Sequence, residues 1–232
     1  MDIFEHPVIF TLFGMPIRKT VVMTWILMAM IIGLVIVIRK VKPSLLEMLL
    51  ELISGIVGDV LDADNLIPYL PILGSLFIFV MFANILSVIP GLSSPTADVN
   101  TTLALALVVF FAVHYYGIRK KGVWGYLTTI SDPIFLLPLE LIGQISRTIS
   151  LTLRLFGNIM SSDLIVAIVF SLIPLIVPVP LILLGMLTGV LQAYIMTTLA
   201  TLYVASAVEI SIEEERKKQI ILSKENQSGK EK

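Results

Sequence analysis

The chain has 232 residues, of which 57% are apolar and 14% charged, with a formal net charge of -1. This composition is far more apolar than that of a soluble domain and predicts an all-α integral membrane protein with about five transmembrane helices. The absence of cysteine excludes disulfides and thiolate metal sites, and the basic residues lie in short runs at segment ends, so we expect no cofactor, no metal and no nucleic-acid partner.

The first apolar run covers residues 20–38, long enough to cross a hydrocarbon core of ~30 Å. The chain begins with the acidic residues Asp2 and Glu5, where a signal peptide would be basic, and the first apolar run has no cleavage pattern. Both features argue against a signal peptide, so we expect the mature chain to begin near Met1. Residues 44–62 carry acidic side chains among leucines and isoleucines. This pattern predicts an amphipathic helix at the interface that does not cross the membrane.

Two further spans are expected over residues 69–89 and 101–116. The first ends at a Pro-Gly pair, and the second ends at Gly117 and the basic run that follows it. Residues 95–100 connect the two spans.

The next apolar segment, residues 134–170, would measure ~55 Å as one helix, nearly twice the membrane thickness, so it must tilt steeply or break. Residues 174–180 contain three prolines and predict a tight return. Residues 181–208 have no charge and predict the last span. Residues 1–212 therefore form one membrane domain, and the polar tail 213–232 is expected to be disordered and solvated.

The basic runs predict the orientation of the chain. With five crossings, the runs at 39–42, 119–121 and 216–218 all fall on one side, whereas the turns at 90–100 and 174–180 carry no basic residue. This places the N-terminus outside and the C-terminus in the cytoplasm. The basic pair Arg18 and Lys19 lies on the opposite side, but the three runs on the cytoplasmic side determine the prediction. No inverted repeat of the kind found in many secondary transporters is visible.

Between residues 141 and 208 only three residues are charged, Arg147, Arg154 and Asp163. A continuous helix face, polar at six of seven positions, is formed by Glu140, Gln144, Arg147, Leu151, Arg154, Asn158 and Ser161. Asp163 is half a turn away from Arg154, so the two do not form a local salt bridge. A guanidinium at membrane depth costs about 2.5–3.5 kcal/mol on insertion scales, which favours a functional role for Arg154.

Structural alternatives exist for several polar residues. Arg147 could snorkel to the cytoplasmic interface, and Asn158 could form an interhelical hydrogen bond. Asp98 could be a helix N-cap. His114 is expected to be a packed or interfacial histidine. Gln192 could either form a hydrogen bond to a neighbouring helix or line a channel, and the sequence does not favour one role over the other.

Three motifs carry a resemblance to a known family: SLTLRLFGNIMSSD at 150–163, PTADVN at 95–100 and LQAY at 191–194. Together they resemble subunit a of the bacterial F-type ATP synthase, the stator half of its proton channel. The similarity extends from the first span to the start of the tail. The resemblance implies that the last two helices form a long, steeply tilted hairpin around the ring of c subunits.

The resemblance also implies roles for individual residues. Arg154 matches the essential stator arginine that faces the c ring. Residues Asn158, Asp163 and Gln192 match positions of the outer half-channel, Asp98 and Asn100 lie near its mouth, and Glu140 matches the cytoplasmic half-channel. Related chains often carry a histidine or another ionisable group where this one has Gly185. The relay pair for Asp163 is therefore incomplete, and water or another residue has to take its place.

The resemblance thus implies a proton-translocating subunit of a bacterial plasma-membrane ATP synthase, with the c ring, b-type stalk subunits and the lipid bilayer as partners. It has no phosphate-binding loop, so we expect ATP chemistry to occur on other subunits. A self-sufficient transporter or channel with an arginine site and a purely structural scaffold are the alternatives. Whether the coupling ion is H⁺ or Na⁺ is not set by this chain, because that selectivity resides mainly in the ring.

Overall fold

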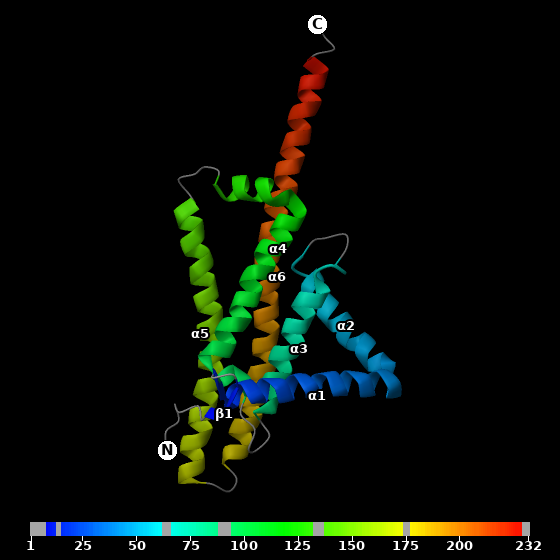
Figure 1. Ribbon diagram of the computed structural model, residues 1–232. Coiled ribbons are helices and arrows are strands. Elements are labelled where there is room, and N and C mark those ends of the chain that lie inside the picture. Colours follow the sequence, from blue (N-terminus) through cyan, green and yellow to red (C-terminus); the bar gives the residue numbers. More distant parts are fainter. Residues whose placement is uncertain are drawn as a thin grey trace.

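The structure is a computed structural model that describes residues 8–12, 15–61, 66–87, 94–131, 137–173 and 177–228 (Figure 1). Helices dominate this part of the chain, which confirms the predicted all-α membrane class. The elements are β1 (Val8–Leu12), β2 (Met15–Arg18), α1 (Lys19–Val41), α2 (Pro43–Gly58), α3 (Leu70–Leu86), η1 (Pro95–Ala97), α4 (Val99–Ser131), α5 (Leu137–Leu172) and α6 (Pro178–Ser228). The antiparallel hairpin of β1 and β2 is not among the predicted elements.

Four helical segments of the described chain are long and apolar enough to cross a membrane: Lys19–Val41, Val99–Lys120, Pro138–Leu172 and Pro178–Val208. They make this a multi-pass membrane protein. The shorter α3 is also apolar but has only 17 residues, about 25 Å of helix. It is shorter than the predicted run 69–89, whose end lies outside the described residues.

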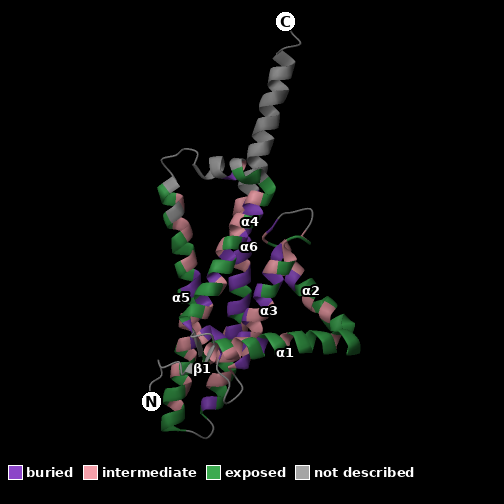
Figure 2. Cartoon of the chain, in the orientation of Figure 1, coloured by how far each residue is buried: buried purple, intermediate pink, exposed green. Residues whose placement is uncertain are grey.

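Helix α1 runs crosswise to α4, α5 and α6 (Figure 1). Leu27 is its one buried residue, and most of its other residues are exposed (Figure 2). Because α1 and the α5–α6 pair point in such different directions, they cannot all stand upright in one bilayer. The 36 residues of α5 form one unbroken helix of about 54 Å, longer than the ~30 Å thickness of a hydrocarbon core.

The core lies where α3, α4, α5 and α6 meet, and α2 packs against its side. Its members include Val57, Leu73, Phe77, Val80, Ala106, Val109, Leu151, Leu155, Ala193, Met196 and Ala200. Small residues on α6 let the backbones approach closely, as is common between membrane helices. At the closest approach, Asn84 Nδ2 of α3 donates to the carbonyl oxygen of Gly189 at 2.8 Å.

Helix α4 does not end at Gly117 as predicted, because it continues to a kink at Gly122. Gly117 is buried against the ring of Tyr126, and a Cβ at this position would meet that ring. The glycine therefore makes room for packing rather than ending the helix. The chain bends at Gly122 instead, where φ is +74°, a conformation that glycine adopts without steric cost.

Helix α6 begins within the predicted proline turn. Pro178 and Pro180 lie in its first turn, where the backbone N–H groups have no helical acceptor and their loss costs little. Residues 174–176 of that turn lie outside the described residues.

Helix α6 also continues to Ser228, so the prediction of a disordered tail is wrong for residues 213–228. Glu213 and Glu214 precede Lys217 and Lys218 by four residues. Opposite charges at this spacing stabilise a helix. The last four residues lie outside the described chain.

Candidate functional site

Helix α5 buries one face and leaves the charged residues at its edge. Leu151, Thr152, Leu155 and Ile159 are buried, whereas Arg154 is exposed. No ion pair to Arg154 is formed by any residue that the structure describes. The guanidinium therefore lies at a surface where a group from outside the chain can reach it.

Asp163 is also exposed on α5 and does not pair with Arg154. This agrees with the half-turn between them, because the two side chains lie on different faces of α5. Four of the other predicted site residues, Glu140, Asn158, Asp98 and Asn100, fall into three separate groups.

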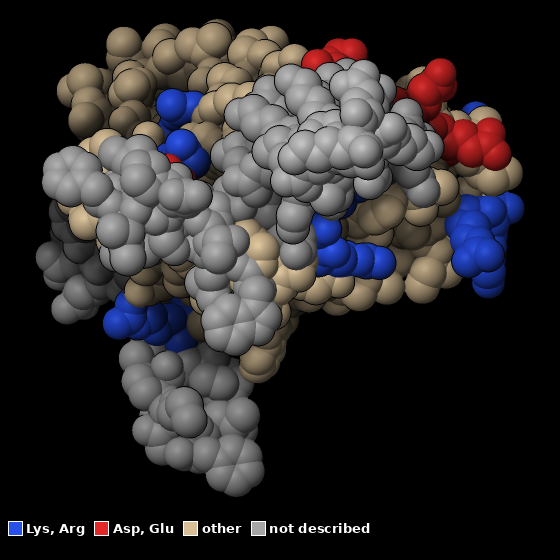
Figure 3. Space-filling view, turned by 90° about the horizontal axis from the view of Figure 1, so that it is seen from above, with Lys and Arg blue, Asp and Glu red and all other residues tan. Residues whose placement is uncertain are grey.

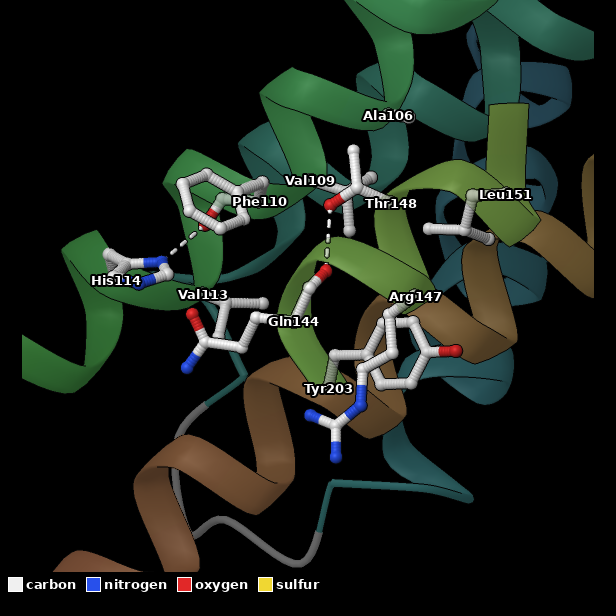
Figure 4. A pocket seen from close by; sticks show the side chains of 10 residues that line it. All are labelled: Ala106, Val109, Phe110, Val113, His114, Gln144, Arg147, Thr148, Leu151 and Tyr203. Carbon is white, nitrogen blue, oxygen red and sulfur yellow. Dashed lines mark hydrogen bonds between the residues drawn. The ribbon is translucent and has the colours of Figure 1, made fainter. Parts of the chain in front are cut away.

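The first group lies between α4, α5 and α6 (Figure 4). A cavity of about 20 Å³, room for one water molecule, is lined mainly by apolar side chains together with His114, Gln144, Arg147, Thr148 and Tyr203. Gln144 Nε2 donates to Glu140 Oε1 at 3.3 Å, which joins the predicted Glu140 to this cavity. The Arg147 guanidinium lies over the ring of Tyr203. Arg147 therefore packs on α6 rather than simply extending to solvent.

His114 is packed, as expected. Its Nδ1 lies 2.8 Å from the Phe110 carbonyl oxygen, and its ring contacts Phe110 and Tyr126. Burial raises the pKa of the Tyr126 hydroxyl, and the charge of Glu140 raises it further. Tyr126 is therefore a neutral phenol at physiological pH, near both His114 and Glu140.

The second group lies between α5 and α6 beyond Arg154. A cavity of about 190 Å³ is lined by Asn158, Ser161, Ser162, Ile165, Val166, Leu181, Leu184, Gly185 and Thr188. The Ser162 hydroxyl lies against Gly185, in the space that a side chain there would occupy. Ser162 and Thr188 were not among the predicted site residues, although Ser162 lies within the motif at 150–163, eight residues after Arg154.

The third group lies around η1, before α4. Asp98 Oδ1 accepts hydrogen bonds of 2.9 Å from the Asn100 backbone N–H and from Asn100 Nδ2. Asp98 is thus the N-cap of α4, the structural alternative considered for it. Asn100 is exposed.

A buried polar network next to η1 was missed by the sequence analysis. Thr96 Oγ1 donates to Asn84 Oδ1 at 3.0 Å, and Ser94 Oγ donates to the Ala83 carbonyl oxygen at 2.8 Å. Asn84 was the available signal, because it is the one amide in the apolar run of α3. This network fixes η1 against α3, and Asn84 in turn bonds to Gly189 of α6.

Gln192 is buried on α6, three residues after Gly189. Its side chain has no hydrogen-bond partner among the described residues. The structure therefore gives it no helix-bonding role within this part of the chain.

Comparison with known proteins decides the family. The family model described as "ATP synthase A chain" matches residues 21–205. The chain belongs to the ATP synthase subunit a family. An "ATP synthase subunit a 2" from Picosynechococcus sp. is 44% identical over 220 residues, which cover 90% of this chain and 92% of that protein.

Further members of the subunit a family agree over most of the chain. An "ATP synthase subunit a 2" from Bradyrhizobium sp. is 43% identical over 203 residues, 83% of this chain and 89% of that protein. "ATP synthase subunit a" from Moorella thermoacetica is 38% identical over 208 residues, 86% of this chain and 95% of that protein. All three groups of site residues lie within the part that the family model matches.

Proposed function

We propose that this member of the subunit a family is the stator of a rotary proton channel, with Arg154 facing the c ring between two offset half-channels. The observation that carries the proposal is the order of features along α5. The cavity at Gln144–Leu151 lies on one side of Arg154, and the cavity at Asn158–Val166 lies on the other. The two access routes would therefore be separated by a fixed positive charge.

The chemistry of arginine fits this place. Its pKa exceeds ~12, so it cannot carry a proton and acts only by its charge. It would hold an arriving ring carboxylate in the ionised form and repel protons that could pass directly from one half-channel to the other. The carboxylate is then reprotonated from one route, travels through lipid as a neutral acid and releases its proton into the other.

Further support comes from the exposed surface of the α5–α6 hairpin. On α5 it includes Ile145, Ile149, Leu153, Ile165 and Ile168, and on α6 it includes Leu184, Leu187, Leu191, Tyr194 and Leu202. An apolar surface of this extent suits contact with lipid or with another membrane protein. We propose that the c ring covers it and that b-type stalk subunits contact the rest of the domain.

The cavity at Asn158 offers a replacement for the ionisable group absent at Gly185. Its hydroxyl and amide groups, from Ser161, Ser162, Thr188 and Asn158, can hold water in about 190 Å³. We propose that this water connects Asp163 and Gln192 to the outside, with Asp98 and Asn100 nearer the mouth. Glu140, Gln144 and Arg147 would line the cytoplasmic route.

We also propose the orientation of the chain in the membrane and the location of ATP synthesis on other subunits. The N-terminus lies outside and the C-terminus lies in the cytoplasm of a bacterial cell. The chain itself does not catalyse ATP synthesis. A membrane potential supplies about 2.3 kcal/mol per charge per 100 mV, so several ions must cross for each ATP made on the other subunits.

The test is ATP-driven pumping by the purified complex in liposomes, with wild-type chain and with Arg154→Ala or Arg154→Lys. We expect both variants to lose coupled pumping, because an alanine has no charge and an ammonium lacks the planar fork of the guanidinium. Normal pumping by either variant would contradict the proposed role. A sodium-dependent rate in the wild type would replace the proton by Na⁺ as the coupling ion.

The rival function is transport by this polypeptide alone. It predicts ion flux in liposomes that contain only the purified chain, whereas a stator requires the c ring. The position of Arg154 at an open surface, and not inside a closed cavity of this chain, favours the stator.

A further inference from the structure

A third cavity, at the end of the apolar part of α4 and before its kink at Gly122, has no part in the proposed ion pathway. It measures about 180 Å³ and is lined by Pro68, Tyr69, Tyr116, Arg119 and Lys120. Pro68 and Tyr69 lead directly into α3, and Lys120 ends the apolar part of α4. The cavity therefore lies where the membrane-crossing part of the chain meets the headgroup region.

Two tyrosines give this cavity a fixed wall. The Tyr116 hydroxyl donates to the Pro68 carbonyl oxygen at 2.8 Å, which ties α4 to the start of α3. The rings of Tyr69 and Tyr116 lie 4.8 Å apart. Tyrosine is enriched at the membrane interface because one end of its side chain is apolar and the other is polar.

The charge at the cavity is positive. Arg119 and Lys120 are both exposed, and neither forms an ion pair with a residue that the structure describes. Arg119 Nη1 donates to Tyr115 Oη at 3.4 Å, so its other donors stay available. On the face seen in Figure 3 the basic side chains form separate patches. A local pair of cations beside a cavity suits one anionic group better than an extended polyanion.

An apolar track leads from this cavity along α4 into the membrane. Tyr115, Phe111 and Val108 precede Arg119 at helical spacing and are 52%, 64% and 49% exposed. Side chains at these intervals lie on one face of a helix. A ligand with a charged head and an apolar tail could therefore bind with its head in the basic cavity and its tail along the apolar residues of α4.

We propose that this cavity binds the phosphate-bearing headgroup of an anionic phospholipid, with an acyl chain along Val108, Phe111 and Tyr115. The Arg119 guanidinium can bind two phosphate oxygens at once, and Lys120 adds a second charge. The cavity has room for several water molecules, which is enough for a phosphodiester group.

The test uses native mass spectrometry of the detergent-purified complex titrated with phosphatidylglycerol or phosphatidylcholine. We expect the wild type to retain phosphatidylglycerol in preference to phosphatidylcholine. The double variant Arg119→Gln/Lys120→Gln should weaken phosphatidylglycerol binding about tenfold or more, because each cation near the surface contributes to the attraction. The charge-preserving variant Arg119→Lys/Lys120→Arg should keep most of it.

The matched control is Arg39→Gln/Lys40→Gln, which removes the same charge from the end of α1, outside the cavity lining. It should bind the lipid like the wild type. Equal loss in both glutamine variants would show unspecific electrostatic attraction, and no loss in either would show that the cavity is not the site. Both results would overturn the proposal.

Two further arms distinguish a lipid from a free anion. Phe111→Asn should weaken phosphatidylglycerol binding, since it interrupts the apolar track. Millimolar inorganic phosphate should not displace the lipid from the wild type. Displacement by phosphate, together with unchanged lipid binding by Phe111→Asn, would identify a site for free anions and overturn the lipid assignment.

Discussion

The Arg147 guanidinium carbon lies 5.2 Å from the centre of the Tyr203 ring, so a cation of α5 rests on an aromatic face of α6. Such a contact contributes about 0.5–1 kcal/mol at an exposed site and up to about 2 kcal/mol when water is excluded. It holds the two helices together beside the smaller cavity. Arg147 thereby obtains a partner within the chain, in contrast to Arg154.

The first prediction concerns this contact. Tyr203→Leu should lower the free energy of unfolding of the subunit by about 1 kcal/mol, because the ring under the guanidinium is lost. Tyr203→Phe keeps the ring and should remain close to the wild type. Thermal unfolding in detergent, followed by circular dichroism, measures the difference. If the phenylalanine and leucine variants unfold alike, the cation contact contributes nothing.

A second prediction concerns the closest approach of α3 and α6. A Cβ on Gly189 would lie 2.6 Å from Asn84 Cβ, which cannot move without the α3 backbone. Gly189→Ala should therefore destabilise the chain by about 1–3 kcal/mol and break the bond from Asn84. The control is Gly33→Ala in α1, where nothing lies within 4 Å. It should be neutral or stabilising by up to about 1 kcal/mol in a thermal unfolding experiment.

The helices could be predicted from the sequence because hydrocarbon allows only apolar runs of sufficient length to cross. The ends of the helices could not be predicted, because glycine and proline near an end can either terminate a helix or be accommodated within it. Gly117 looks like a stop, but it is a notch for Tyr126, a residue nine positions later whose contact depends on the bend at Gly122. Pro178 looks like a breaker, but the first turn of α6 tolerates it.

The candidate site shows a similar division. The family motif directs attention to Arg154 and Asn158, and helical spacing gives their relative positions on α5. The role of Ser162 depends on its contact with Gly185, 23 residues away on another helix, and no pattern within α5 indicates it. The network of Asn84 with Thr96 depends likewise on a turn whose path is set by tertiary packing.

A third prediction concerns alkaline pH. The pKa of Tyr126 is raised above 10.0 in the folded chain, first by burial and then by Glu140. The unfolded chain therefore loses this proton first as the pH increases, and stability present below pH ~10 is lost as the pH rises through the folded pKa. Tyr126→Phe has no hydroxyl to ionise and should therefore lose less stability than the wild type between about pH 9 and about pH 11. This range extends about one unit on either side of the reference pKa of tyrosine. Unfolding midpoints of both chains across this range provide the measurement, and parallel curves would contradict the assignment.

The last prediction separates folding from partner contact at Gly157. This residue is three positions after Arg154, and a Cβ on it would meet no atom of the described residues within 4 Å. Gly157→Leu should therefore leave the unfolding of the isolated subunit nearly unchanged or slightly improve it, because leucine forms helices better than glycine. If the c ring passes close to Arg154, the same side chain occupies the space of the ring and should reduce ATP-driven pumping by the complex at least tenfold. Gly33→Leu, on the exposed surface of α1, is the matched control and should pump normally. A Gly157→Leu complex that assembles and pumps at the wild-type rate would mean that the ring does not approach this face of α5, and the position proposed for Arg154 would then be wrong.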